Sequence, residues 1–134
     1  MRLFIVLCAI IISLSACSFF VSSDIHLVDV KTATAVDEKL MPVKITDVFP
    51  KDSSKVICWF QWNDAKVNTQ VTAKWHYVTD DVHILDYPFH IPKKTGMGSV
   101  ALSAPEGRPL PSGDYKVQLF EGKHLLRSAG FKIE

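Results

Sequence analysis

The segment from Lys55 to Val78 constrains the fold more than any other part of the sequence, because its apolar side chains recur at every second position. A period of two, with many aromatic and β-branched residues, indicates β-strands. Residues 56–62 and 70–77 therefore predict two strands, joined by a polar turn at 63–66. The faces expected to be buried carry Val56, Cys58, Phe60 and Trp62 on the first strand, and Val71, Ala73, Trp75 and Tyr77 on the second.

Short apolar runs separated by turn residues continue along the chain. They predict further strands at 43–49, 82–85, 99–103, 115–120 and 125–133, with a proline- and glycine-rich corner at 106–113. Residues 25–36 are predicted to form a first edge strand or, alternatively, an extended linker. Seven or eight short strands at regular spacing are typical of an all-β sandwich.

Three residues relate this pattern to a known family. Cys58, Trp75 and Tyr115 stand in the order of the strand B cysteine, the buried strand C tryptophan and the strand F tyrosine of immunoglobulin-like sandwiches. The second cysteine of that family is replaced by Val117. The sequence thus resembles an Ig-like sandwich that lacks the inter-sheet disulfide. The resemblance implies a single antiparallel β-sandwich domain over residues 25–134.

The beginning of the chain carries the most specific motif. Arg2 gives a positive start, residues 3–14 are apolar, and Leu14-Ser15-Ala16-Cys17 follows. This string resembles the lipobox of bacterial lipoproteins, which implies a signal peptide at 1–16, a lipid on Cys17 and a tether at 17–24. An ordinary signal peptidase would need a small residue where Leu14 stands. An uncleaved anchor over residues 3–21 is the remaining alternative, since that segment is just long enough to span a bilayer.

Ser18 follows the cysteine at the position where aspartate usually retains lipoproteins in the inner membrane. The resemblance therefore implies attachment to the outer membrane, with the periplasmic face preferred over the cell surface. Two or more acyl chains make a stable anchor. The expected membrane contact is thus the lipid on Cys17.

Cys58 is expected to be the one free thiol of the mature chain, because Cys8 would leave with the signal peptide and Cys17 would become a thioether. No intramolecular disulfide is then possible. Its apolar neighbours on the strand favour a buried, inert side chain, and the alternative is a bond to a partner chain.

The charges are balanced, with 15 basic and 14 acidic residues. Arg2 is the only charged residue before Cys17, so the mature chain would be neutral. This balance argues against nucleic-acid binding and against electrostatic binding to a membrane.

Two aromatic features are candidate partner-binding sites. Ile57 and Trp59 point away from the predicted core, so either the amino-terminal strand covers them or they form an exposed patch for a partner. A glycan or small-ligand module using Trp59 is an alternative from a different class. The segment 86–97 places Tyr87, Phe89 and Ile91 on a long loop suited to protein recognition, or on an edge strand protected by prolines and lysines.

The string Ser112-Gly113-Asp114-Tyr115 has two interpretations. It predicts a tyrosine corner, in which the Tyr115 hydroxyl binds an upstream carbonyl. It also resembles the loop of bacterial inhibitors of goose-type lysozyme. That second reading requires Ser112 and Tyr115 on a protruding loop, with Tyr115 outside the core.

No pattern of catalytic residues is found. Gly96 to Ala101 fits G-x-G-x-x-A, but a strand follows where a phosphate site needs a helix. His76, His83 and His90 lack the close spacing of metal ligands. We therefore expect no enzyme, cofactor or metal site. The expected function is an outer-membrane lipoprotein that binds envelope proteins, as an accessory subunit of a secretion or pilus complex.

Overall fold

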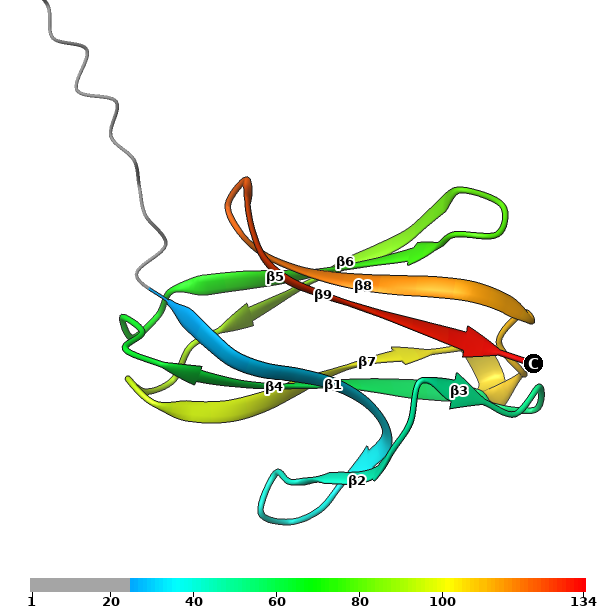
Figure 1. The fold of residues 1–134 in the computed structure, drawn as a ribbon, viewed down its shortest axis with the longest axis horizontal. Coiled ribbons are helices and arrows are strands. Elements are labelled where there is room, and N and C mark those ends of the chain that lie inside the picture. The colour runs from blue at the N-terminus through cyan, green and yellow to red at the C-terminus, as the bar shows by residue number, and fades with distance from the viewer. Residues whose placement is uncertain (1–24) are drawn as a thin grey trace, which may run out of the picture.

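The computed structural model describes residues 25–134, which form two facing β-sheets (Figure 1). The first sheet has the order β2-β1-β4-β7 and consists of β1 (His26–Val36), β2 (Pro42–Ile45), β4 (Lys55–Asn63) and β7 (Gly96–Ser103). The second has the order β3-β9-β8-β5-β6 and consists of β3 (Val48–Phe49), β5 (Gln70–Tyr77), β6 (Val82–His90), β8 (Gly113–Glu121) and β9 (His124–Ile133). The one helical element in this range is the 3-10 turn η1 (Pro105–Gly107). The all-β sandwich predicted from the sequence is confirmed.

The inner faces of β4 and β5 fill the space between the sheets. All the side chains predicted to point inward on these strands are buried except Tyr77, which is half-buried. Aromatic rings meet edge to face, with centroids 5.1 Å apart for Phe60 and Phe89 and 6.1 Å apart for Trp75 and Phe131. Each such pair contributes about 0.5–1.5 kcal/mol beyond the burial of its area. The core is therefore an aromatic layer centred on the two strands that the sequence pattern identified.

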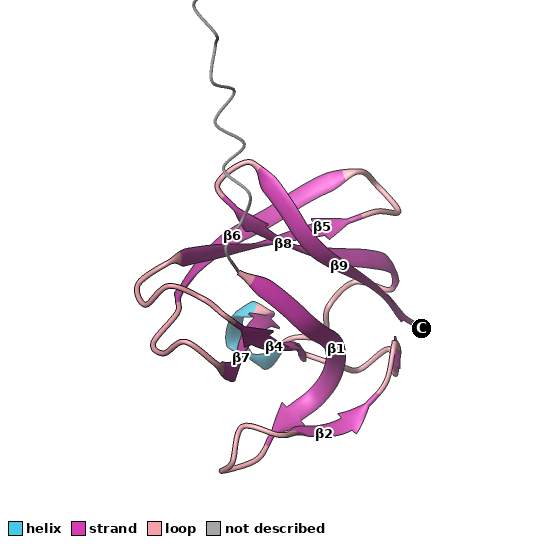
Figure 2. Cartoon of the chain, turned by 60° about the vertical axis from the view of Figure 1, so that its left-hand side comes forward, coloured by secondary structure: helices cyan, strands magenta, loops and turns pink. Residues whose placement is uncertain are grey.

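Strand β1 lies inside the first sheet, between β2 and β4 (Figure 2). The predicted strand over residues 25–36 is confirmed, whereas its expected position at the edge of the sheet and the alternative of an extended linker are wrong. Arg127 of β9 fastens the start of β1 to the second sheet, because its guanidinium donates to the carbonyls of Leu27 at 3.2 Å and Val28 at 3.1 Å. These hydrogen bonds join two segments a hundred residues apart in the chain, so no local sequence pattern could indicate them.

The single strand predicted at 43–49 is divided between the two sheets. β2 belongs to the first sheet, and β3 pairs with β9 of the second in the only parallel pairing among the described strands. Thr46 stabilises the crossing, since its hydroxyl donates to the Val48 carbonyl at 2.9 Å and accepts from the Val48 N–H at 3.1 Å. The hydroxyl of Thr32 on β1 also stabilises this crossing, because it donates to the Thr46 carbonyl at 2.6 Å.

Strand β6 extends from Val82 to His90 as the edge of the second sheet. The loop interpretation of residues 86–97 is wrong up to His90, and the edge-strand alternative is confirmed there. Pro88 lies opposite Thr72 within the pairing. Proline cannot donate to a ladder of hydrogen bonds, so its place in an edge strand is the one expected within a sheet.

The tyrosine corner is confirmed. The Tyr115 hydroxyl donates to the carbonyl of Pro111, and the ring is buried. Tyr77 packs beside it with ring centroids 4.8 Å apart and donates to the carbonyl of Ser112. Gly113 has a φ of +142°, and a Cβ there would lie 2.6 Å from the Tyr77 hydroxyl. Burial and then the nearby Tyr77 raise the pKa of Tyr115 to about 12.

We predict that Tyr115→Phe lowers the free energy of unfolding at neutral pH by about 1 kcal/mol, the typical worth of one hydrogen bond. Tyrosine in an unfolded chain ionises near pH 10. The raised pKa of Tyr115 therefore stabilises the fold below that pH, and this contribution disappears as the pH rises toward 12. Urea titrations at pH 7, 10 and 11 should show that the free energy of unfolding falls less with rising pH in Tyr115→Phe than in the parent protein. Tyr87→Phe, at a half-exposed ring, is the matched control. An equal pH dependence of both variants would contradict the prediction.

Candidate interaction surfaces

The outer face of β4 is covered. Ile57 and Trp59 are each only 4% exposed. The Trp59 indole N–H donates to the carbonyl of Leu40 at 2.7 Å, in the turn between β1 and β2. Of the two interpretations of these residues, coverage by the amino-terminal segment is confirmed. Their candidacy as exposed partner-binding residues is corrected, because the β1–β2 hairpin already occupies the surface that a partner would need.

The turn of this hairpin, residues 37–41, is held by Asp37. Its carboxylate accepts from the N–H groups of Lys39 at 2.8 Å and Met41 at 3.0 Å. Leu40 adopts a φ of +61°, a left-handed conformation that is unfavourable for leucine. Strain of this kind persists only where surrounding contacts enforce it. Here the carboxylate of Asp37 and the indole of Trp59 determine the conformation together.

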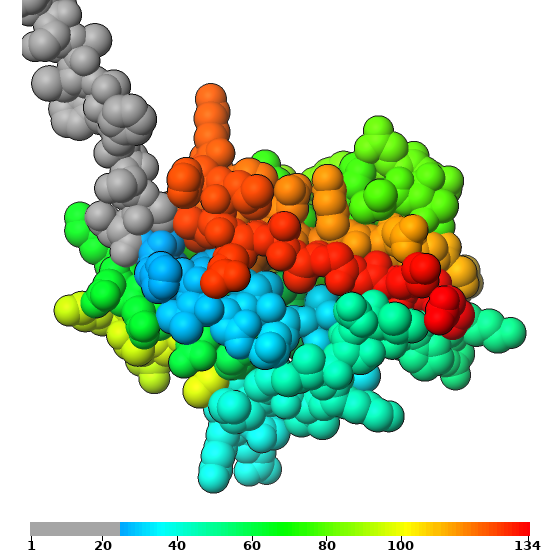
Figure 3. Space-filling view, viewed as in Figure 1, coloured from blue at the N-terminus to red at the C-terminus, as the bar shows by residue number. Residues whose placement is uncertain are grey.

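The same hairpin exposes apolar side chains that the sequence analysis did not select. Figure 3 shows the segment in cyan, protruding from the body of the domain. We call its exposed apolar residues the hairpin surface; they are Leu40, Met41, Val43 and Ile45. Their concentration within six residues was visible in the sequence, but the interpretation of 43–49 as one ordinary strand concealed that they are solvent-exposed.

The three candidates around β6 have different environments. Ile91 is fully buried, and its backbone pairs with the β4–β5 loop through Thr69 at 2.9 Å and Asn68 at 2.8 Å. Its expected exposure is wrong. Phe89 is half-buried, and its ring lies against Phe60 of the core. Of the three, only Tyr87 is exposed, at 49%.

Tyr87 is one of four exposed apolar side chains on β6 and the turn that precedes it. We call these four residues the β6 surface; they are Val78, Val82, Ile84 and Tyr87. Strand β6 pairs with β5 on one side only, and no other described strand pairs with it. The outer backbone edge of this strand is therefore available for pairing with another chain.

A groove of about 590 Å³ borders the β6 surface. It lies between the edges of the two sheets, with Ile84 and Leu85 of β6 on one side and Leu102 of β7 on the other. The segment that follows η1 closes the groove with Leu110, flanked by prolines. An ion pair between Arg108 and Glu106, 3.2 Å apart, lies at its exposed rim. The groove is apolar along its walls and charged at its mouth.

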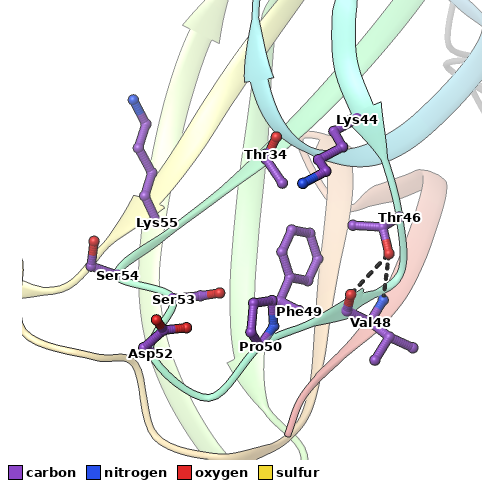
Figure 4. Close-up of a pocket in the computed structure, with 10 residues that line it drawn as sticks. All are labelled: Thr34, Lys44, Thr46, Val48, Phe49, Pro50, Asp52, Ser53, Ser54 and Lys55. Atoms are coloured by element: carbon purple, nitrogen blue, oxygen red, sulfur yellow. Dashed lines mark hydrogen bonds between the residues drawn. The ribbon is translucent and has the colours of Figure 1, made fainter.

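A second, more polar pocket of about 440 Å³ lies where the chain crosses between the sheets (Figure 4). Lys44 points toward the ring of Phe49, whereas Lys55 points away from it. The hydroxyl of Thr46 is engaged by Val48. Because the charged groups do not converge on one point, this pocket lacks the arrangement expected of an anion or small-ligand site.

The remaining polar candidates form pairs and no larger cluster. His76 contacts Asp81 at 2.8 Å, and His83 contacts Asp86 at 3.3 Å. Within residues 25–134 there is no group of three or more His, Cys, Asp or Glu side chains that could hold a metal ion. The G-x-G-x-x-A match at 96–101 lies inside β7.

Cys58 is the free cysteine of the described part of the chain, and it is fully buried. Burial raises the pKa of its thiol to about 12. Because the thiolate is the reactive form, the thiol is inert at neutral pH, as the sequence predicted.

Tyr115 also decides the interpretation of the Ser112–Tyr115 loop. Its ring stacks on Phe131 inside the core, with centroids 5.0 Å apart. The condition for a lysozyme-inhibitor-like loop, a tyrosine outside the core, is not met.

Comparison with known proteins identifies the fold. No protein-family model and no curated protein matches the sequence. An immunoglobulin-like protein from Pseudomonas aeruginosa superimposes with a TM-score of 0.57 at 13% identity, covering 82% of this chain and 96% of that one. The domain is an immunoglobulin-like β-sandwich. An alkylpurine DNA glycosylase from Pseudomonas fluorescens, solved with DNA containing an abasic site analogue, gives 0.52 at 11% identity over 84% of this chain and 31% of that one. At such identities the likeness concerns the fold alone.

The Ig-like arrangement explains the groove. In constant-type Ig domains a strand D lies beside strand E, whereas in variable-type domains strand C′ joins the sheet of C, F and G. Here β6 joins the sheet of β5, β8 and β9, and no described strand lies outside β7. The two sheets therefore end in open edges on the same side of the sandwich, with the groove between them.

The lipobox and the tether, residues 14–24, lie outside the described residues. Among residues 25–134, no helix has the length and hydropathy needed to cross a membrane. Lipidation of Cys17 therefore stays a prediction of the sequence.

We predict that Trp59→Phe lowers the free energy of unfolding by about 1–3 kcal/mol, because it removes the donor that satisfies the Leu40 carbonyl. Hydrogen exchange of the amides in residues 37–41 should accelerate, while exchange in β5 and β8 should change little. Lys39→Ala, in the same turn but with an exposed side chain, is the control. Unchanged exchange in the turn of Trp59→Phe would contradict this account of how the hairpin is held.

Proposed function

We propose that this protein is a non-enzymatic lipoprotein of the bacterial outer membrane that binds a protein partner through its Ig-like domain. Cys17 carries the lipid, and the β6 surface receives the partner. The proposal is carried by the exposed apolar strand edge that borders an apolar groove. The partner class is an envelope protein, such as a component of a secretion or pilus complex to which this domain is accessory.

The chemistry of β6 supports binding of an extended segment. An edge strand exposes backbone donors and acceptors with which a second chain can pair. Natural edges are commonly protected by lysine or proline. From Val82 to Tyr87 the strand contains neither; this stretch carries one charged side chain, Asp86, and a register irregularity opposite Trp75 and His76, and the first proline is Pro88. Ile84 and Tyr87 add apolar area beside the open backbone.

The groove supports selectivity for apolar side chains. Successive side chains of a strand point in opposite directions. A partner strand laid along β6 would direct every second side chain toward the walls formed by Leu85, Leu102 and Leu110. The preferred partner is therefore an extended segment with apolar residues at alternate positions.

The alternatives have less support. A glycan-binding module would use Trp59, which the β1–β2 hairpin covers. A small-ligand site would need converging polar groups, which the pocket in Figure 4 lacks. A lysozyme-inhibitor-like role would need an exposed Tyr115, which is buried.

We predict that the protein incorporates labelled palmitate in cells and that Cys17→Ala abolishes this labelling, because the thiol is the acceptor of the lipid. Cys58→Ala, at the buried thiol, is the matched control and should keep the label. Fractionation of the same cells should place the labelled protein in the outer membrane. Palmitate on the Cys17→Ala variant would sink the anchor assignment.

We predict that crosslinking of the native lipoprotein in its own membranes captures a defined set of envelope proteins. Ile84→Lys and Tyr87→Lys should reduce capture several-fold, because each places a charge on the apolar strand edge. Ile45→Lys, at an exposed apolar position on the hairpin surface, is the matched control.

Thermal unfolding of the three variants should stay close to that of the parent, because all three side chains are exposed. Loss of capture with Ile45→Lys alone would move the interface to the hairpin surface. Recovery of the bare monomer from the parent would overturn the protein-partner function.

A further inference from the structure

The strand topology gathers four segments at one end of the sandwich. The start of β1 pairs there with the end of β4, His26 opposite Asn63. The β4–β5 loop (64–69), the β6–β7 loop (91–95) and the β8–β9 turn (122–123) connect strands at the same end (Figure 1). We call this the tether end, because residue 25 enters the domain there. Between one of these loops and the next, the chain runs along a strand to the opposite end of the sandwich and returns along another. We call that opposite end the far end.

The tether end is basic. Basic side chains outnumber acidic ones there by five to two. The five basic residues, all exposed, are Lys66, Lys93, Lys94, Lys123 and Arg127, and the acidic residues are the exposed Asp64 and the half-buried Glu121. Asp64 contacts Lys94 at 3.9 Å, but both side chains are more than three-quarters exposed. Exposed pairs of this kind are weak. The surface potential of this end is therefore positive.

The far end has the opposite balance. The exposed acidic residues there are Asp47, Asp52, Asp80, Asp81, Glu106, Asp114 and Glu134, against the basic residues Lys44, Lys51, Lys55, Arg108 and Lys132. The balanced composition of the whole chain thus conceals two ends of opposite sign. Net charge alone argued against electrostatic membrane binding, and the distribution of the charges removes that objection.

The covalent chain holds the basic end near the bilayer, on the premise of the proposed lipid at Cys17. Only the eight residues 17–24 separate the lipid from the domain. Even fully extended, they reach roughly 28 Å at 3.3–3.6 Å per residue. Electrostatic forces decay over about 8 Å at physiological salt. A domain held this close repeatedly brings its lysines within range of the headgroups.

We propose that the tether end docks on anionic phospholipid headgroups and thereby orients the domain on the membrane. Charge complementarity and the entry point of the tether both select this end. Val67, 56% exposed and adjacent to Lys66, offers an apolar contact at the same surface. The groove lies near the far end, beside the beginning of β6 and the end of β7. Docking would therefore turn the partner-binding groove away from the bilayer.

Lysine footprinting tests the orientation. The acylated protein is purified from membranes and inserted into vesicles of phosphatidylcholine alone or of phosphatidylcholine and phosphatidylglycerol at three to one. Acetylation by a water-soluble reagent is then quantified for each lysine by mass spectrometry. Lys66, Lys93, Lys94 and Lys123 should be protected several-fold in the anionic vesicles, relative to Lys51, Lys55 and Lys132. High salt should remove the protection, because counterions screen the attraction.

Two matched triple variants separate lipid docking from other causes. Lys66→Glu, Lys94→Glu and Lys123→Glu together should abolish the protection of Lys93. Lys51→Glu, Lys55→Glu and Lys132→Glu together should leave it intact. Equal labelling of both ends in both lipids would overturn the proposal, and so would protection that appears only when native envelope extract is added.

The experiment distinguishes an error in the proposed lipidation of Cys17 from an error in the proposed docking of the tether end. A protein without acyl chains would stay out of both kinds of vesicle, which refutes the proposed lipidation and the docking that rests on it. An acylated protein that enters both vesicles with no protected end keeps its anchor, and only the docking is refuted.

Discussion

Strand β4 is apolar on both faces, and the rest of the structure depends on covering both of them. The inner face packs against the second sheet, where Phe60 and Trp62 both contact the ring of Phe89 on β6. The outer face, with Ile57 and Trp59, would expose a large apolar area on an ordinary sandwich. The β1–β2 hairpin covers it, and the indole of Trp59 fastens the hairpin by its bond to Leu40. The left-handed conformation of Leu40 is held by this contact together with the hydrogen bonds of Asp37.

Covering β4 on both sides determines which apolar residues stay exposed. The side chains that could have formed a binding platform, Ile57 and Trp59, become part of the interior. The exposed apolar side chains lie instead on the hairpin itself and on β6, at the opposite edge of the sandwich. Cys58 lies on the inner face with Phe60 and Trp62, and burial keeps its thiol in the protonated form at neutral pH. The exposed apolar side chains therefore lie at the periphery of the domain.

The same topology separates the charges. Strands that run alternately in opposite directions place every second loop at one end, so the β4–β5, β6–β7 and β8–β9 connections meet there. Their lysines, which lie between Lys66 and Lys123 in the sequence, gather at this end of the domain. The groove beside β6 lies toward the other end. A lipid anchor, a basic contact surface and a partner groove would then follow one another along the long axis of the domain.

Much of this architecture was determined by the sequence alone. Alternating side chains identified β4, β5 and their inward faces, and Tyr115 identified the corner, because periodicity and turn chemistry are local properties. The exposure of Tyr87, the burial of Ile91 and the two-sided pairing of β1 were decided by tertiary structure. A side-chain period of two indicates that the two faces of a strand differ, but it does not indicate which part of the chain covers each face. That depends on contacts such as Trp59 with Leu40 and Arg127 with Leu27, which join residues far apart in the chain.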